Sequence, residues 1–273
     1  MGDGLISFCL ISTEHGPLLV NRHDRHYNFD GSEFGVGFQL IEHGKYESRE
    51  VEVLKDLLRV RRKYYGDGVV ALDVGANIGV HSVEWAKMMT KWGHVVAIEA
   101  QERIFYALCG NLTLQNCLNA RAINGAVGAE CGELSFPEPN YTIPSSFGSF
   151  ELRQRLGGEN IGQSLDYSKP TLTVQQISLD SLGLDRCDLI KIDVEGMEEE
   201  VLEGAKNLIE RHKPVLYVET VKSDAEAITK LLEGWNYKVL PHGMNIIAIS
   251  NSDETLAHVK HEKVMAGSMP EAR

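Results

Sequence analysis

Hydrophobic runs alternate with amphipathic stretches along most of the chain. The run from Val69 to Val74 is apolar except for Asp73, which is typical of a strand buried on both faces of a sheet. Strands alternating with helices favour an α/β fold with a mostly parallel, doubly wound sheet. The short Pro241-His242-Gly243 connection predicts an antiparallel hairpin at the edge of that sheet. The pattern predicts helices over 79–91, 102–117, 197–212 and 224–234, and strands over 94–98, 121–127, 187–192, 214–218, 237–240 and 245–249.

Three other segments flank or interrupt this alternation. Residues 1–66 are interpreted as an N-terminal extension, with a hairpin of strands 5–11 and 18–21 and an amphipathic helix over 47–64. The α/β domain would span 67–252, followed by a tail over 253–273. Residues 128–178 are rich in proline and glycine and too long for an ordinary connection. Two readings stay open for this insertion: a lid that covers the substrate, or a structural excursion with an added hairpin.

Charge and composition exclude several classes of function. The net charge of −12 argues against a nucleic-acid partner, and the cluster from Arg59 to Lys63 is better explained as cations at a helix end. No apolar stretch approaches the roughly 18–20 residues of a membrane span, so no membrane partner is expected. The five cysteines match no zinc or redox spacing. We expect a cytoplasmic protein, and the oligomeric state stays open, a homodimer included.

A glycine turn follows the strand 69–74. A dinucleotide fingerprint counted from Gly75 would need glycines at Asn77 and Val80, so a nicotinamide-dependent oxidoreductase is a weaker alternative. Asp73 followed by Gly75, Asn77 and Gly79 instead has the form found in S-adenosylmethionine enzymes, in which backbone groups hold the amino-acid end of the cofactor. These four residues are therefore predicted to bind the cofactor.

Glu99 stands at the end of the next predicted strand. A carboxylate at this position can accept hydrogen bonds from both hydroxyls of a ribose. The cofactor would then carry an adenosine without phosphates, for which a carboxylate is a suitable partner. Glu99 is predicted to bind the ribose.

These motifs resemble the FkbM family of methyltransferases. The resemblance covers roughly 69–220 and rests on the glycine turn with Ile98-Glu99, on the segments 111–116, 124–128 and 201–205, and above all on Ile190-Lys191-Ile192-Asp193-Val194-Glu195-Gly196-Met197-Glu198. It implies a Rossmann-like fold with an antiparallel last strand, S-adenosylmethionine as methyl donor, and a hydroxyl of a small molecule, sugar or natural product as acceptor. It also implies that adenine lies against Gly125 and Ala126.

Catalysis requires a base near the acceptor hydroxyl. Asp193 and Glu195 lie at the carboxyl end of a predicted strand, and either is a candidate base or an orienting group. Asp193 is also expected to be among the residues that bind the cofactor. Alternatively, Glu195 caps the helix that follows. His81, in the first turn after the glycine loop, is a further candidate base, although a histidine without a chemical role is the simpler reading. Lys191 is expected to point away from Asp193 and is assigned no role.

A bound metal and a non-catalytic role are the remaining alternatives. Asp193 and Glu219 end adjacent predicted strands and could together hold Mg²⁺, but two ligands make a weak site, so no metal is the primary expectation. His23, Asp24 and His26 are better explained as a polar loop. Phe147 and Phe150 could stack on an acceptor or anchor the insertion. A protein that binds adenosine cofactors without turnover, as a scaffold, is the alternative from another functional class.

Overall fold

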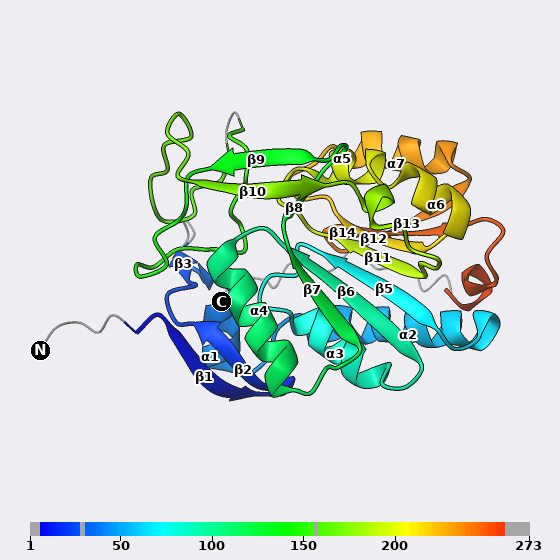
Figure 1. Cartoon of the computed structure of the whole chain (residues 1–273), viewed down its shortest axis with the longest axis horizontal. Coiled ribbons are helices and arrows are strands. Elements are labelled where there is room, and N and C mark those ends of the chain that lie inside the picture. Colours follow the sequence, from blue (N-terminus) through cyan, green and yellow to red (C-terminus); the bar gives the residue numbers. More distant parts are fainter. Residues whose placement is uncertain (1–5, 28–30, 156–157, 260–273) are drawn as a thin grey trace, which may run out of the picture.

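A seven-stranded sheet runs through the centre of the part of the chain described by the computed structural model, residues 6–27, 31–155 and 158–259 (Figure 1). All neighbouring strands are parallel except that β14 is antiparallel to both of its neighbours. The fold is therefore Rossmann-like, as predicted, and the antiparallel last strand lies inside the sheet, next to its edge. The strand order is β13 (Tyr237–His242), β14 (Asn245–Ser250), β12 (Val215–Glu219), β11 (Leu189–Ile192), β5 (Val69–Val74), β6 (Gly93–Glu99) and β7 (Ala120–Asn124).

Helices cover both faces of this sheet, as Figure 1 shows. Alternation along each strand sends Ala71 of β5 into one hydrophobic core and Leu72 into the other. Both are fully buried, which explains why the strand reads as a continuous apolar run. The helices of the first face are α2 (Ser48–Tyr65), α3 (Val80–Met88) and α4 (Glu102–Leu114), and those of the second are α5 (Glu198–Glu203), α6 (Lys206–His212) and α7 (Ala225–Gly234).

The helix predicted over 197–212 is in fact two helices, α5 and α6. The chain bends at Gly204, where an added Cβ would lie 2.1 Å from the carbonyl oxygen of Gly128. The carbonyl of Gly204 accepts a hydrogen bond from the amide of Asp180, and the Asp180 carboxylate accepts from the amides of Asn207 and Leu208. Asp180 thus caps α6 from outside the helix, a contact that local periodicity cannot reveal.

The strand predicted over 121–127 is also divided, at Gly125. Its second part, β8 (Ala126–Val127), leaves the main sheet and pairs with β10 (Leu172–Ile177), which pairs in turn with β9 (Gly132–Phe136). An added Cβ at Gly125 would lie 2.9 Å from the carbonyl oxygen of Gln175. The insertion therefore begins and ends in a small three-stranded sheet, as the reading of an added hairpin requires.

The N-terminal hairpin is confirmed, with its turn at Glu14 and His15. Its strands are β1 (Phe8–Thr13) and β2 (Gly16–Asn21), and β2 packs on α4, where Asn111 hydrogen-bonds to both the amide and the carbonyl of Leu19. Residue 5 of the predicted first strand and 260–273 of the predicted tail lie outside the described residues. The sequence pattern did not predict β3 (His26–Tyr27), β4 (Glu33–Phe34) or α1 (Val36–His43), nor the 3-10 helices Leu179–Leu182 and Glu254–His258. Among the described residues, no helix is both long and apolar enough to cross a membrane.

Candidate active site

A cavity of about 300 Å³ opens at the carboxyl ends of the central strands. The glycine turn after β5, the end of β6 and the start of β8 form one wall. The loop after β11, the end of β12 and the residues Tyr46 and Glu47 before α2 form another, and part of the insertion between 146 and 152 completes it. Doubly wound sheets bind their ligands at this edge, so this cavity is the candidate ligand site.

The glycine turn brings three backbone segments close together. Gly75 has φ +79°, and an added Cβ would lie 1.7 Å from the carbonyl oxygen of Asp193. Gly79 has φ +87° and packs against Leu108 of α4. Asn77 lies between them at φ +50°, with its side-chain oxygen accepting a hydrogen bond from the amide of Ile78 at 2.7 Å. Gly75, Asn77 and Gly79 all line the cavity, as expected of a turn that binds a ligand through its backbone.

Glu99 also lines the cavity, and it is only 6% exposed. One carboxylate oxygen accepts the amide N–H of Asn77 at 2.9 Å and the other accepts that of Gln101 at 2.8 Å. Burial raises the pKa of Glu99 to about 7, although these two backbone hydrogen bonds favour the ionised form. The carboxylate is thus held in one orientation, and each oxygen keeps a lone pair for a ligand hydroxyl.

Asp73 does not reach the cavity lining. It is 1% exposed, and one carboxylate oxygen accepts a hydrogen bond from the Ser82 hydroxyl of α3 at 2.6 Å. The other oxygen is buried without a hydrogen-bond partner among the described residues, and burial raises the pKa of the group. In this arrangement Asp73 joins β5 to α3 beneath the turn, and its predicted contact with the cofactor stays a prediction.

Three carboxylates meet on the opposite wall of the cavity. Ligand atoms of Asp193, Glu195 and Glu219 all lie within 4.8 Å of one another. Two ammonium groups accompany them: Lys191 donates to Asp193 at 2.8 Å, and Lys222 lies 2.7 Å from Glu195. Burial and the charge of Asp193 raise the pKa of Glu195 to about 8 and that of Glu219 to about 9. The predicted acids Asp193 and Glu195 are therefore accompanied by Glu219, which was predicted only as a possible metal ligand.

Glu195 does not cap the following helix. Its backbone is left-handed, with φ +56°, and its carboxylate points to Lys222. The amides of Val194 and Gly196 donate instead to Glu198, which lies at the start of α5. No side-chain hydrogen bond caps α5 at its N-cap residue, Met197, and the Glu195 side chain lines the cavity.

The expectation that Lys191 points away from Asp193 was wrong. Residues two apart in a strand share a face of the sheet, and the two side chains are hydrogen-bonded. Lys191 also stands opposite Asp73 in the register of β11 and β5, and opposite Tyr217 in that of β11 and β12. A row of polar side chains therefore crosses the face that α2 and α3 cover. Burial disfavours the ammonium of Lys191, but the surrounding carboxylates outweigh it and raise its pKa.

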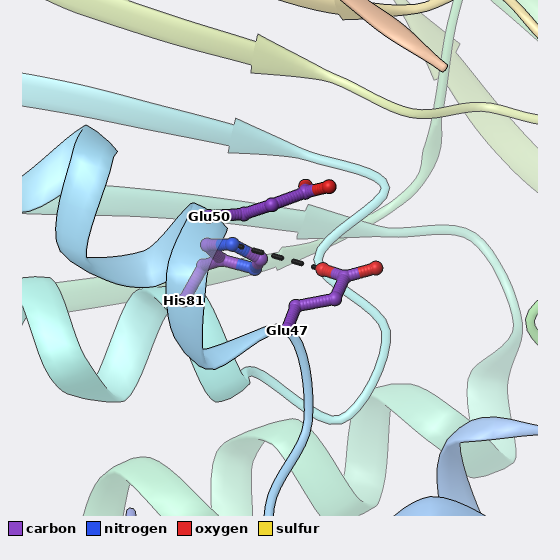
Figure 2. Close-up of side chains that lie close together, drawn as sticks. All are labelled: Glu47, Glu50 and His81. Atoms are coloured by element: carbon purple, nitrogen blue, oxygen red, sulfur yellow. Dashed lines mark ion pairs between the residues drawn. The ribbon is translucent and has the colours of Figure 1, made fainter. Parts of the chain in front are cut away.

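His81 lies in the first turn of α3 and lines the cavity, but away from the three carboxylates just described. Figure 2 shows it facing Glu47 and Glu50, from the start of α2. Its Nε2 is 3.7 Å from a Glu47 carboxylate oxygen and has no hydrogen-bond partner among the described residues. Burial and the charge of Lys191 hold the pKa of His81 well below its usual value, so the ring is neutral.

The insertion forms part of the cavity as well as the small sheet. Phe150 is buried and lines the cavity, whereas Phe147 packs against Tyr141, with ring centroids 4.8 Å apart. The amide of Phe147 donates to Asp24, which also accepts from the amide of Gly37. Asp24 therefore joins the N-terminal extension to the insertion, in keeping with a structural rather than a metal-binding loop.

The adenine end was predicted at Gly125 and Ala126. Both residues line the cavity on the side of Glu99, and the amide of Gly125 donates to the Glu99 carbonyl at 3.0 Å. The predicted adenine position therefore adjoins the predicted ribose position at Glu99. The contact of Gly125 and Ala126 with adenine stays a prediction.

The methyltransferase FkbM domain family matches residues 73–239. The chain belongs to this family. The match begins at Asp73, so the FkbM segment contains the glycine turn, Glu99 and the three carboxylates, and excludes Glu47 and Glu50.

The chain is also similar to solved structures of methyltransferases. An FkbM methyltransferase from Methylobacillus flagellatus KT is 17% identical, with a TM-score of 0.47 over 67% of this chain and 43% of that one. The precorrin-6y C5,15-methyltransferase from Geobacter metallireducens GS-15 is 15% identical, with a TM-score of 0.44 over 76% and 90%. The chain thus spans less than half the length of the first of these proteins. No curated protein matches the chain.

Four charged residues of this FkbM chain were not identified from sequence as part of the site: Glu47, Glu50, Lys191 and Lys222. Lys191 lies within the family motif. Its place two residues before Asp193 on a strand was enough to predict that the two side chains share a face of the sheet. Lys222 follows β12 by a few residues and carried no pattern. Glu47 and Glu50 belonged to an amphipathic helix, where exposed acids are ordinary. Their position at the cavity depends on how α2 packs, which the local sequence does not show.

Proposed function

We propose that this chain is an S-adenosylmethionine-dependent methyltransferase that acts on a hydroxyl oxygen of a small molecule or carbohydrate. One observation supports the proposal most directly. A single cavity has the glycine turn and Glu99 on one side, and the carboxylates of Asp193, Glu195 and Glu219 on the other. A donor site and a set of proton acceptors thus face the same space.

The residues of the first side suit the cofactor. The Glu99 carboxylate is fixed by two amides and can accept both hydroxyls of a ribose. The turn at Gly75 exposes backbone to the cavity where no side chain would fit, which suits the amino-acid end. Gly125 and Ala126 leave a flat, uncharged surface for adenine. When bound, S-adenosylmethionine supplies an electrophilic methyl group on a sulfonium.

The residues of the second side suit activation of a hydroxyl. As the acceptor oxygen bonds to the methyl carbon, the bond from carbon to sulfur breaks and the hydroxyl proton passes to a carboxylate. Glu195 is well suited to receive it because the pKa of Glu195 is raised to about 8, which makes its ionised form a stronger base. Asp193, 26% exposed toward the cavity and fixed by Lys191, is the second candidate base.

The proposal is tested by methyl transfer from isotopically labelled S-adenosylmethionine to a panel of sugars, polyols and phenols, with matched amines in place of hydroxyls. We expect label in hydroxyl compounds and in none of the amines. Asp193→Asn and Glu195→Gln should lower turnover by about 10²–10⁴-fold, with affinity for S-adenosylhomocysteine within a few-fold of wild type. Glu210→Gln, on the exposed face of α6, is the matched control and should behave as wild type.

The pH dependence separates the two candidate bases. If Glu195 is the base, kcat/KM rises as the pH approaches 8, and the rise disappears in Glu195→Gln. If the rise is kept in Glu195→Gln, Glu195 is not the base. Methylation of amines alone would contradict the hydroxyl assignment, and tight cofactor binding without turnover on any acceptor would favour the scaffold alternative.

A further inference from the structure

A second group of potential ligands combines two glutamates of the N-terminal extension with His81 of α3, and Glu47 and His81 of this group line the cavity. Ligand atoms of Glu47, Glu50 and His81 all lie within 4.8 Å of one another. Glu47 and Glu50 come from the start of α2 and His81 from the start of α3, and Figure 2 shows the three side chains close together. No lysine or arginine in 6–27, 31–155 or 158–259 lies within ion-pair distance of either glutamate. This group therefore differs from the carboxylates of Asp193 and Glu195, each of which has a lysine.

The buried imidazole of His81 is the strongest indication of a ligand. The residue is 4% exposed, and its Nε2 has no hydrogen-bond partner in the described part of the chain. A buried polar atom without a partner costs about 1–3 kcal/mol, so its environment requires an explanation. The nearest acceptor, Oε2 of Glu47, is 3.7 Å away, which is too far for a hydrogen bond. The same 3.7 Å is close to the distance between two ligand atoms on one tetrahedral Zn²⁺, which is about 3.4 Å for bonds of roughly 2.0–2.1 Å.

Neighbouring groups hold the Glu50 carboxylate in place, as the residues around the ligands of metal sites do. The side-chain amide of Asn245 donates to Glu50 at 3.2 Å and to the Tyr217 hydroxyl at 2.9 Å. Tyr217 in turn contacts Nδ1 of His242 at 3.1 Å. These residues come from β12, β13 and β14, so the main sheet orients a carboxylate of the extension.

The charge of the surroundings favours a cation. Lys191 is the ammonium that acts on both Glu47 and His81, and it is hydrogen-bonded to Asp193. Asp73 adds a further carboxylate beside Lys191. Carboxylates thus outnumber ammonium groups here, and a divalent ion would reduce the repulsion between Glu47 and Glu50.

We propose that Glu47, Glu50 and His81 bind one divalent transition-metal ion, of the Zn²⁺ or Mn²⁺ kind. One imidazole and two carboxylates suit these ions better than Mg²⁺, which prefers oxygen ligands alone. Three protein ligands leave a coordination position open. Because Glu47 and His81 line the cavity, that position faces it. This inference rests on the proposed function: an acceptor oxygen would bind the ion at the open coordination position. His81 would then be a metal ligand and not a base.

Metal binding by the full chain, stripped with a chelator, tests the proposal without any assay of turnover. Calorimetric titration with Zn²⁺ and with Mn²⁺ should show one site per chain. His81→Ala and Glu50→Gln should each weaken binding at least ~100-fold, and Asn245→Ala about 10–100-fold. His94→Ala removes an exposed histidine of β6, and Glu219→Gln removes an acid of the other group. Both should bind as wild type does.

Several results would overturn the proposal: no binding to folded wild type at millimolar ion, equal affinity in His81→Ala and wild type, or a loss in Glu219→Gln alone, which would place the ion among the other carboxylates. Circular dichroism checks the fold of each variant. Glu50→Gln keeps the shape of the side chain and decides the matter if His81→Ala fails to fold. S-adenosylhomocysteine titrations on the same samples separate failure of this site from failure of the proposed function.

Discussion

The two sides of the cavity are built by different means. On the side of the glycine turn and Glu99, which we call the cofactor wall, the Glu99 carboxylate is satisfied by two backbone amides. On the side of Asp193, Glu195, Glu219, Glu47 and His81, which we call the acceptor wall, Asp193 and Glu195 pair with lysine side chains, and Nε2 of His81 has no partner among the described residues. The first wall depends on chain geometry and the second on charge, so substitutions should affect them differently.

The largest expected effect is on the geometry of the cofactor wall. Gly75→Ala adds a Cβ that would lie 1.7 Å from the Asp193 carbonyl oxygen, at a residue whose φ is positive. Left-handed strain of about 1–2 kcal/mol and overpacking of about 1–3 kcal/mol together predict a loss of about 2–5 kcal/mol in the free energy of unfolding, measured by urea denaturation. Gly132→Ala, whose Cβ would meet nothing within 4 Å, is the matched control. Equal stability of the two variants would contradict the close approach.

The next effect is on the charges of the acceptor wall. Lys222 is 10% exposed and pairs with Glu195, and its ammonium also donates to the Ser149 carbonyl of the insertion at 2.7 Å. Lys222→Met should lower the free energy of unfolding by about 3 kcal/mol, since it leaves a buried carboxylate without its partner. The double variant Lys222→Met/Glu195→Gln should recover part of that loss in a double-mutant cycle. Strict additivity of the two substitutions would show that the pair contributes nothing.

A smaller effect concerns the ionisation of Glu99. Its pKa of about 7 lies above the ordinary 4.5, so the ionised form that accepts ribose hydroxyls is lost as the pH falls through 7. Affinity for S-adenosylhomocysteine should then weaken about tenfold for each pH unit below 7. Calorimetry between pH 5.5 and 8.5 measures this slope, and Glu99→Gln should remove it. A flat profile in wild type would contradict the raised pKa, because Glu99 would then keep one protonation state throughout this range.

The same contrast explains what the sequence could predict. The strands, most helices and the cofactor wall follow from local patterns, because the hydrophobic run 69–74, the glycine turn and Glu99 each lie within a short segment. The break at Gly204 and the capping by Asp180 depend on tertiary contacts, and so were missed. In the acceptor wall, Asp193, Glu195 and Glu219 were predicted from the ends of strands, and His81 from its place in the first turn after the glycine loop. Through the packing of α2, Glu47 reaches the cavity and Glu50 reaches His81, which no local pattern encodes.

The central claim is that the cofactor wall binds an adenosine cofactor without phosphates. Calorimetric titration of S-adenosylhomocysteine and of NAD into wild type and Glu99→Ala tests it most directly. We predict micromolar binding of S-adenosylhomocysteine to wild type, a loss of about 2–3 kcal/mol in binding free energy for the variant as charge-assisted hydrogen bonds disappear, and no binding of NAD. Binding of NAD in place of S-adenosylhomocysteine, or equal affinity in wild type and variant, would contradict the account.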